Sequence, residues 1–127
     1  MEELVAKRVL VADDSDTVTT VLANALEQEG YEVDIAANGV EAYEKGITGA
    51  YDLVILDQLM PGMLGLEVIE RWNREGHKLS TIMLSGVDDD RTVVGSFESG
   101  AVDFIRKPFR LPELLARVRQ RVQARSD

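Results

Sequence analysis

The stretch that most constrains the fold is residues 51–65, which reads YDLVILDQLMPGMLG. Four consecutive apolar residues, 53–56, predict a strand that is buried on both faces of a sheet. That strand ends at a carboxylate, Asp57, before Pro61 and Gly62 turn the chain into a loop. An acid at the carboxyl end of a buried parallel strand lies where open α/β sheets hold their sites. Taken alone, Asp57 is equally compatible with a helix cap or a solvated loop acid.

Strand and helix patterns alternate along the chain, which predicts βα units around a parallel sheet. Five strands are expected, at residues 8–12, 31–35, 53–56, 81–84 and 102–105. A helix is expected after each strand, because apolar residues then recur at helical spacing, and glycines end the first four helices. The strand at 31–35 alternates polar and apolar residues, so we expect it at an edge of the sheet.

Each helix is expected to turn one apolar face toward the sheet. The residues expected on these faces are Val18, Val21, Leu22, Ala25 and Leu26; Leu66, Ile69 and Trp72; Val93, Val94 and Phe97; and Leu111, Leu114, Leu115, Val118 and Val122. Ser15 or Asp14 is expected to cap the first helix. Three acids at 88–90 begin the fourth helix, where negative charge suits the helix dipole.

With 127 residues, the chain is expected to form one domain, residues 1–127, with a core large enough to be stable without disulfide or metal crosslinks. It has no cysteine, which excludes disulfides and thiolate metal sites and favours a reducing compartment. No stretch resembles a signal peptide or reaches the length of a membrane span. We therefore expect a cytoplasmic protein with no membrane partner.

The net charge of −9 argues against direct nucleic-acid binding, since phosphate would be repelled by most of the surface. The charge is uneven, because residues 106–127 hold seven of the 14 basic residues and only two of the 23 acidic ones. This basic end is compatible either with a partner surface or with an ordinary solvated helix face.

Five polar residues lie at the carboxyl ends of four expected strands: Asp13 and Asp14, Asp57, Ser85, and Lys107. In a parallel sheet these ends share one edge, so we expect the five side chains to gather there. Three carboxylates need a cation, and hard oxygen ligands without histidine or cysteine favour Mg²⁺. A carboxylate nucleophile, a divalent cation, a lysine and a hydroxyl are what phosphoryl transfer requires.

Each of these residues alone also has an ordinary structural explanation. An Asp pair after a strand commonly caps a helix, a lone lysine is commonly a surface residue, and Ser85 can simply make a turn. Their combination at four strand ends favours a shared site over coincidence. The single histidine, His77, follows the third helix in a loop, which argues against a zinc site.

Four motifs carry a resemblance to a known family: VLVADDS at 9–15, VILDQLMPGMLG at 54–65, IMLSG at 82–86 and DFIRKPF at 103–109. The sequence resembles the CheY-like receiver domain of bacterial two-component response regulators over nearly all of its length. The resemblance implies an α/β fold, doubly wound and flavodoxin-like, with five parallel strands in the order 2-1-3-4-5 and five helices. It also implies a cis peptide bond between Lys107 and Pro108.

The resemblance assigns roles to the acidic residues. Asp57 would be the phosphoacceptor, taking a phosphoryl group from a histidine kinase or a phosphotransfer protein. Asp13 and Asp14, together with Asp57 and the backbone carbonyl of Leu59, would bind Mg²⁺, or Mn²⁺ in its place. A receiver catalyses only its own phosphorylation and slow dephosphorylation, so it is not an enzyme in the usual sense.

The remaining implied roles concern the response to phosphorylation. Ser85 and Lys107 would hold the phosphoryl oxygens, and Phe104 would be the aromatic switch residue that turns inward when Ser85 moves. The side chains of Leu59 and Val87 would flank the path of the hydrolytic water and set the lifetime of the phosphoryl group.

Three positions depart modestly from the family pattern, and none argues against phosphorylation. Leu64 stands where the family often has Asp, Phe104 replaces the commoner Tyr, and Ser85 replaces Thr but keeps the hydroxyl.

The output is implied to pass through the face made by the fourth helix, the fifth strand and the fifth helix. The acids at 88–90 and the arginines Arg117, Arg121 and Arg125 are expected to pair there between two copies. This predicts either a phosphorylation-dependent homodimer or a downstream protein as the partner. The chain is either a single-domain regulator or one domain of a longer protein with a fused output domain.

Other functions remain open from the sequence. A degenerate receiver would bind partners without phosphorylation, although the complete set of five residues argues against it. A Mg²⁺ phosphohydrolase with an aspartyl-phosphate intermediate commonly needs a second acid two residues after the nucleophile, where this chain has Leu59. A flavin-binding module of similar fold would need a phosphate-cradling loop after the first strand, and the acidic ADDSDT would repel a phosphate.

Overall fold

Within residues 6–126, five short parallel strands form one sheet in the order β2-β1-β3-β4-β5, as the family resemblance implied. They are β1 (Arg8–Ala12), β2 (Glu32–Ala36), β3 (Leu53–Leu56), β4 (Thr81–Ser85) and β5 (Asp103–Arg106). The structure, a computed structural model, describes residues 6–126 and the side chains of residues 6–123. The half-exposed β2 lies at an edge of the sheet, which confirms the position expected from its alternating pattern.

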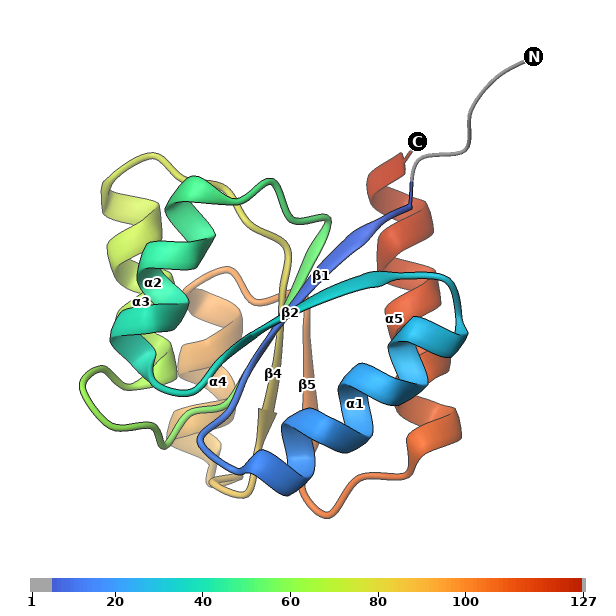
Figure 1. The fold of residues 1–127 in the computed structure, drawn as a ribbon. Helices are drawn as coiled ribbons and strands as arrows, with labels where there is room; N and C mark the ends of the chain where they lie inside the picture. Colours follow the sequence, from blue (N-terminus) through green and yellow to red (C-terminus); the bar gives the residue numbers. More distant parts are fainter. Residues whose placement is uncertain (1–5, 127) are drawn as a thin grey trace.

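Helices cover both faces of this sheet. They are α1 (Asp16–Gln28), α2 (Gly39–Thr48), α3 (Gly65–Arg74), α4 (Asp90–Glu98) and α5 (Leu111–Ser126). In Figure 1 the sheet is seen nearly on its edge, with α1 and α5 on one side and α2, α3 and α4 on the other. Ser15 caps α1, as expected, by accepting from the backbone N–H of Val18 at 3.3 Å. The predicted doubly wound α/β architecture is therefore confirmed.

β3 lies at the centre of the sheet and is buried on both faces, as its apolar residues predicted. Leu53 and Ile55 pack with residues of α1 and α5, while Val54 and Leu56 pack with residues of α2 and α3. Burying one such side chain contributes on the order of 2 kcal/mol, so these contacts hold the strand firmly. The backbone that leads into Asp57, the next residue, is therefore held in place by packing.

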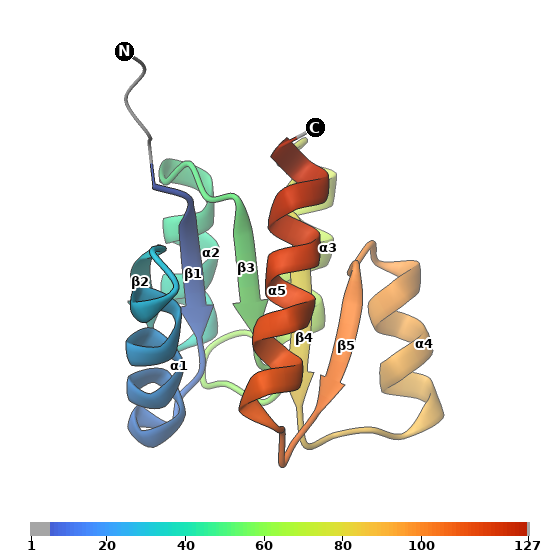
Figure 2. The same cartoon turned by 90° about the vertical axis from the view of Figure 1, so that its right-hand side faces the viewer.

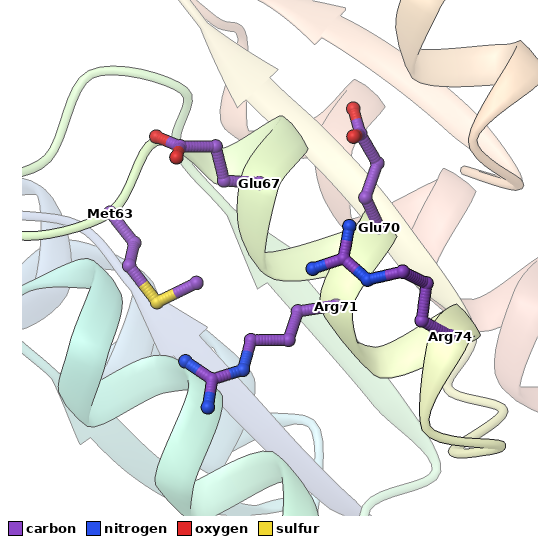
Figure 3. A pocket seen from close by; sticks show the side chains of 5 residues that line it. All are labelled: Met63, Glu67, Glu70, Arg71 and Arg74. Carbon is purple, nitrogen blue, oxygen red and sulfur yellow. The ribbon is translucent and has the colours of Figure 1, made fainter.

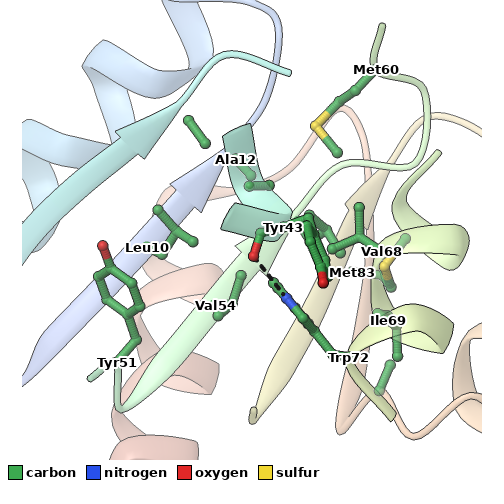
Figure 4. Packing of buried hydrophobic residues seen from close by; sticks show 14 of the residues in the cluster. Leu10, Ala12, Tyr43, Tyr51, Val54, Met60, Val68, Ile69, Trp72 and Met83 are labelled. Carbon is green, nitrogen blue, oxygen red and sulfur yellow. Dashed lines mark hydrogen bonds between the residues drawn. The ribbon is translucent and has the colours of Figure 1, made fainter. Parts of the chain in front are cut away.

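The packing of α2 and α3 against the sheet centres on Trp72, whose side chain is 1% exposed. Its indole N–H donates to the backbone carbonyl oxygen of Tyr43 at 3.1 Å (Figure 4). Gly46 on α2 leaves room for the ring, because a Cβ at this position would lie 2.3 Å from the indole. These contacts fix α3, and the loop that precedes α3 carries part of the candidate site.

Three helix residues that were expected to be buried are exposed. Val94 and Phe97 on α4 are 51% and 48% exposed, and Val21 on α1 is 42% exposed. α4 instead buries Thr92 and Ser96, and the Ser96 hydroxyl donates to the Thr92 carbonyl oxygen at 2.7 Å. Because this hydrogen bond satisfies the polar group, Ser96 can be buried while Val94 and Phe97 face outward. The prediction is therefore wrong for Val94 and Phe97, while Val93, the third residue expected on this face, is partly buried against the core.

The other differences are small. On α3, Val68 is fully buried, and Leu66, which was expected on the buried face, is only partly buried. β2 and β5 each lie one residue later than expected, and β4 extends to Ser85. No helix among the described residues is long and apolar enough to cross a membrane.

Candidate functional site

The predicted site residues lie at the edge of the sheet where the strands have their carboxyl ends. In Figure 2 the arrowheads of β1, β3, β4 and β5 point toward this edge. Asp13 and Asp14 directly follow β1, Asp57 follows β3, Ser85 ends β4, and Lys107 follows β5. The parallel pairing of these strands brings residues from four parts of the chain to one place.

The three aspartates form a tight acidic cluster. Their side chains present carboxylate oxygens that all lie within 4.8 Å of one another. Asp13 and Asp57 are only 3% and 6% exposed, while Asp14 is exposed to solvent. Carboxylates this close repel one another unless a cation lies nearby. An all-oxygen donor set with one solvent-exposed member fits a hard divalent cation such as Mg²⁺, which keeps part of its water shell.

Backbone amides orient the two buried carboxylates. Oδ1 of Asp13 accepts a hydrogen bond from the N–H of Ser15 at 2.9 Å, and Oδ1 of Asp57 accepts one from the N–H of Gln58 at 2.8 Å. The other oxygen of each carboxylate, Oδ2, contacts Lys107. Both carboxylates are therefore held in one orientation by groups on two sides.

Lys107 supplies positive charge to the site. Its ammonium nitrogen lies 2.6 Å from Oδ2 of Asp13 and 3.3 Å from Oδ2 of Asp57. Its backbone N–H donates to the carbonyl oxygen of Ser85 at 3.0 Å, which fixes the start of the loop after β5. The peptide bond between Lys107 and Pro108 is cis, as the resemblance implied.

Burial and these contacts set the electrostatics of the site. Burial raises the pKa of Asp57 above its usual value, and the negative charge of Asp13 raises it further, while Lys107 acts in the opposite direction. Burial alone would lower the pKa of Lys107, but the hydrogen bond to Asp13 and the charge of Asp57 raise it overall. Lys107 is therefore charged at neutral pH and offsets part of the repulsion among the acids.

Ser85 and Phe104, the two residues implied to respond to phosphorylation, are both buried. Ser85 is fully buried, and its hydroxyl oxygen accepts from the backbone N–H of Val87 at 3.0 Å. Phe104 is 7% exposed and belongs to the core on the α2 and α3 side of the sheet. The guanidinium of Arg106 lies 5.9 Å from the centre of the Phe104 ring and pairs with Asp88 at 3.3 Å. The Phe104 ring is therefore largely buried, with the guanidinium of Arg106 over it.

The two residues implied to set the lifetime differ in exposure. Leu59 is 57% exposed in the loop after β3, and Val87 is partly buried in the loop after β4. Neither side chain can donate or accept a proton.

Gln58 lies beside the site and was not among the predicted site residues. Gln58 is 7% exposed, and its side-chain oxygen accepts from the backbone N–H of Leu66 at 2.8 Å. A signal was available in the sequence: Leu64 directly precedes α3 and has no side-chain acceptor, so another residue has to cap that helix.

A surface hollow of about 370 Å³ lies along α3 and is lined by none of the predicted site residues. Figure 3 shows its lining side chains, which are Met63, Glu67, Glu70, Arg71 and Arg74. This mixture of acids and arginines is typical of a solvated helix surface, so the hollow gives no support to a second site.

Comparisons with known proteins point to one family. The model of the response regulator receiver domain matches residues 9–119. The transcriptional regulatory protein ResD of Bacillus subtilis is 40% identical over 119 residues, which cover 94% of this chain and 49% of that protein. A CheY-like response regulator receiver domain from Methanospirillum hungatei has a TM-score of 0.91 at 30% identity, covering 96% of this chain and 98% of that chain.

A further solved structure is that of the response regulator TrrA from Thermotoga maritima in complex with Mg²⁺ and BeF. It has a TM-score of 0.80 at 38% identity, covering 91% of this chain and 98% of that chain. The chain spans about half the length of the transcriptional regulators that it matches. The similarity to those regulators therefore concerns one shared domain.

Proposed function

The chain belongs to the response regulator receiver domain family of two-component signalling, and we propose that it accepts a phosphoryl group on Asp57. The observation that carries this proposal is the contact of Lys107 with both Asp13 and Asp57, because it joins residues that follow three different strands. Isolated helix caps and surface lysines have no reason to meet in this way. In this proposal the phosphoryl donor is the phosphohistidine of a histidine kinase or of a phosphotransfer protein.

The proposed metal is Mg²⁺, with Mn²⁺ as a substitute. The groups that would hold it are the carboxylates of Asp13, Asp14 and Asp57 and the backbone carbonyl of Leu59. The close approach of the three carboxylates, with no nitrogen or sulfur donor among them, supports a hard cation. When bound, the ion supplies positive charge that neutralises phosphoryl oxygens.

The chemical step is a transfer between two nucleophiles. A carboxylate oxygen of Asp57 forms a bond to phosphorus as the nitrogen–phosphorus bond of the donor breaks, and the departing imidazole takes up a proton. The ammonium of Lys107 and the hydroxyl of Ser85 each hold a phosphoryl oxygen. Because the product is a modified side chain of the protein itself, the domain does not act as an enzyme on a free substrate.

Phosphorylation is proposed to reach a partner through Ser85 and Phe104. In this structure the Ser85 hydroxyl oxygen accepts a hydrogen bond from the backbone N–H of Val87. On phosphorylation Ser85 turns toward the phosphoryl group, and this hydrogen bond breaks. Phe104 then repacks into the space that Ser85 leaves. The change is transmitted to the face made by α4, β5 and α5 within a single receiver domain, residues 1–127. A downstream protein or a fused output domain binds there.

A second copy of the chain is the other partner proposed for this face. Exposed apolar residues on α4 favour such a contact. Two of the charged residues expected to pair between copies already have partners within one chain. Asp89 caps α4, and Arg117 pairs with Asp103 and Glu113. The side chain of Arg125 lies outside the described residues. Light scattering with and without beryllofluoride tests the dimer, and a monomer in both conditions would exclude it.

Intact mass after incubation with Mg²⁺ and acetyl phosphate tests the proposed function. The wild-type protein should gain the mass of one phosphoryl group, and the Asp57→Asn variant should gain none. An unmodified wild-type protein would indicate a degenerate receiver that binds partners without phosphorylation. Release of phosphate over many turnovers with no lasting gain in protein mass would indicate a phosphohydrolase.

A further inference from the structure

The N-cap residue of α3, Leu64, provides no side-chain hydrogen bond to its helix. Its backbone has the extended conformation usual for an N-cap, with φ −69° and ψ 153°. The first N–H groups of a helix have no partner within the helix, and a Ser, Thr, Asp or Asn at the N-cap normally accepts from one of them. The start of α3 therefore depends on acceptors from elsewhere in the chain.

Gln58 provides these acceptors from the loop after β3. Its backbone carbonyl oxygen accepts from the N–H of Gly65 at 2.9 Å, and its side-chain oxygen accepts from the N–H of Leu66 at 2.8 Å. The backbone N–H of Leu64 in turn donates to Oε1 of Glu67 at 3.0 Å. Gln58 thus serves the first two donors of α3, and its 7% exposure shields these bonds from water.

The same residue also orients the proposed phosphoacceptor. The backbone N–H of Gln58 donates to Oδ1 of Asp57 at 2.8 Å. α3 begins in close contact with this segment, because a Cβ at Gly65 would lie 2.3 Å from the carbonyl oxygen of Asp57. The residue after Gln58 is Leu59, whose carbonyl is a proposed metal ligand. Gln58 is therefore tied to Asp57 on one side and to α3 on the other, while Leu59 follows it directly.

We propose that Gln58 is a positioning residue that replaces the missing cap of α3 and thereby fixes Asp57 and the Leu59 carbonyl for the metal. The inference rests on the proposed function and adds a residue through which the loop is held. The amide side chain is long enough to reach the second helical N–H from outside the helix. Leu64 has no side-chain acceptor for this N–H. Once α3 holds the side chain, the backbone of residues 57–59 has less freedom, and the oxygen ligands stay aligned.

The test compares Gln58→Met, which keeps the length of the side chain and removes the acceptor, with Gln58→Met/Leu64→Ser, which restores a cap at the usual position. The hydroxyl of the introduced serine would accept from within α3 and would not join residue 58 to the helix. The melting temperature in EDTA measures how much the cap stabilises the fold. Calorimetric titration with MgCl₂ measures the Mg²⁺ affinity, which depends on the positioning of the ligands. Leu64→Ser alone is the matched control, and titration of the wild type with MgCl₂ tests the proposed metal site separately.

Gln58→Met should melt about 4 °C lower than the wild type and bind Mg²⁺ about tenfold more weakly. In the double variant the melting temperature should recover, while the Mg²⁺ affinity should stay low. Wild-type affinity in Gln58→Met, or recovery of both properties in the double variant, would overturn the positioning role. A wild-type protein that binds no Mg²⁺ would overturn the metal site itself.

Discussion

The ammonium nitrogen of Lys107 lies 2.6 Å from a carboxylate oxygen of Asp13, although 94 positions separate the two residues in the chain. The contact joins the end of β5 to the end of β1 across the sheet edge that carries the site. The Asp13 side chain is 2% exposed and that of Lys107 is 23% exposed, so solvent screens this pair less than a surface ion pair. Removing one partner leaves a buried charge without compensation.

Lys107→Met should therefore lower the free energy of unfolding in EDTA by about 3 kcal/mol. Saturating Mg²⁺ should recover part of this loss, since a bound cation takes over the neutralisation of the acids. The double variant Lys107→Met/Asp13→Asn should lose less than the sum of the two single variants, because neither charge is then left alone. Urea unfolding measures all four proteins, and strictly additive losses would contradict a direct coupling.

Asp14→Asn should have opposite effects on the stability of the metal-free protein and on Mg²⁺ binding. Removing one of three neighbouring negative charges should raise the melting temperature in EDTA, because repulsion among the acids is relieved. The same change should weaken Mg²⁺ binding by about tenfold or more and shrink the rise in melting temperature on adding Mg²⁺.

Asp16→Asn is the matched control for this prediction, because Asp16 is an exposed acid in the first turn of α1. It should leave the response to Mg²⁺ unchanged. A wild-type melting temperature that ignores millimolar Mg²⁺ would show that the acids do not bind the ion.

A third prediction concerns pH at the opposite end of the strands. The Tyr51 hydroxyl donates to Oδ2 of Asp34 at 2.7 Å, and the side chain of Tyr51 is buried. Burial, followed by the hydrogen bond to Asp34 and its negative charge, raises the pKa of Tyr51 from 10.0 to about 12. The unfolded chain therefore loses this proton first as the pH rises. The stabilisation by the phenol is fully present below pH 10.0 and is lost between 10.0 and about 12.

Tyr51→Phe should accordingly be about 1 kcal/mol less stable than the wild type near neutral pH, since one hydrogen bond is lost. The difference should shrink as the pH rises above 10.0, because only the wild type then loses the contribution of the phenol. Other tyrosines and lysines titrate equally in both proteins and cancel. Urea unfolding at a series of alkaline pH values measures the difference, and a constant difference would contradict the raised pKa.

The sequence was sufficient to predict the sheet and the meeting of the site residues. Alternating strand and helix patterns imply parallel strands, and parallel strands have their carboxyl ends at one edge. Asp13, Asp57 and Lys107 could therefore be predicted to be neighbours without any knowledge of their distances. Which carboxylate oxygen of Asp13 and of Asp57 contacts Lys107 depends on side-chain geometry. No residue pattern specifies that geometry.

Two features could not be predicted from the apolar pattern or from the usual capping motifs. The buried face of α4 carries Thr92 and Ser96 in place of Val94 and Phe97, since a hydrogen bond within the helix removes the penalty of burying a hydroxyl. Apolar periodicity alone selects the wrong face in such a helix. The cap of α3 by Gln58 spans eight positions of the chain, outside the short range that helix-capping motifs cover.

The last prediction concerns how long the phosphoryl group persists. Its hydrolysis needs a water in line with the phosphorus–oxygen bond. Leu59 and Val87, the residues implied to flank that path, are both apolar and can neither orient nor deprotonate a water. Leu59 is 57% exposed, so its side chain can be substituted without loss of core packing. We therefore expect slow loss of the phosphoryl group in the absence of a phosphatase.

The variant Leu59→Asn/Val87→Glu should lose its phosphoryl group about tenfold faster than the wild type, which corresponds to about 1.4 kcal/mol off the barrier. The polar side chains would hold the attacking water and make the site less dry. The measurement is to phosphorylate with acetyl phosphate, remove the donor, and follow intact mass in Mg²⁺ over time. Leu64→Ser serves as a control, because it exchanges an exposed leucine of the same loop for a polar residue outside the implied water path. Wild-type decay within seconds, or equal decay in the double variant, would show that these two side chains do not set the lifetime.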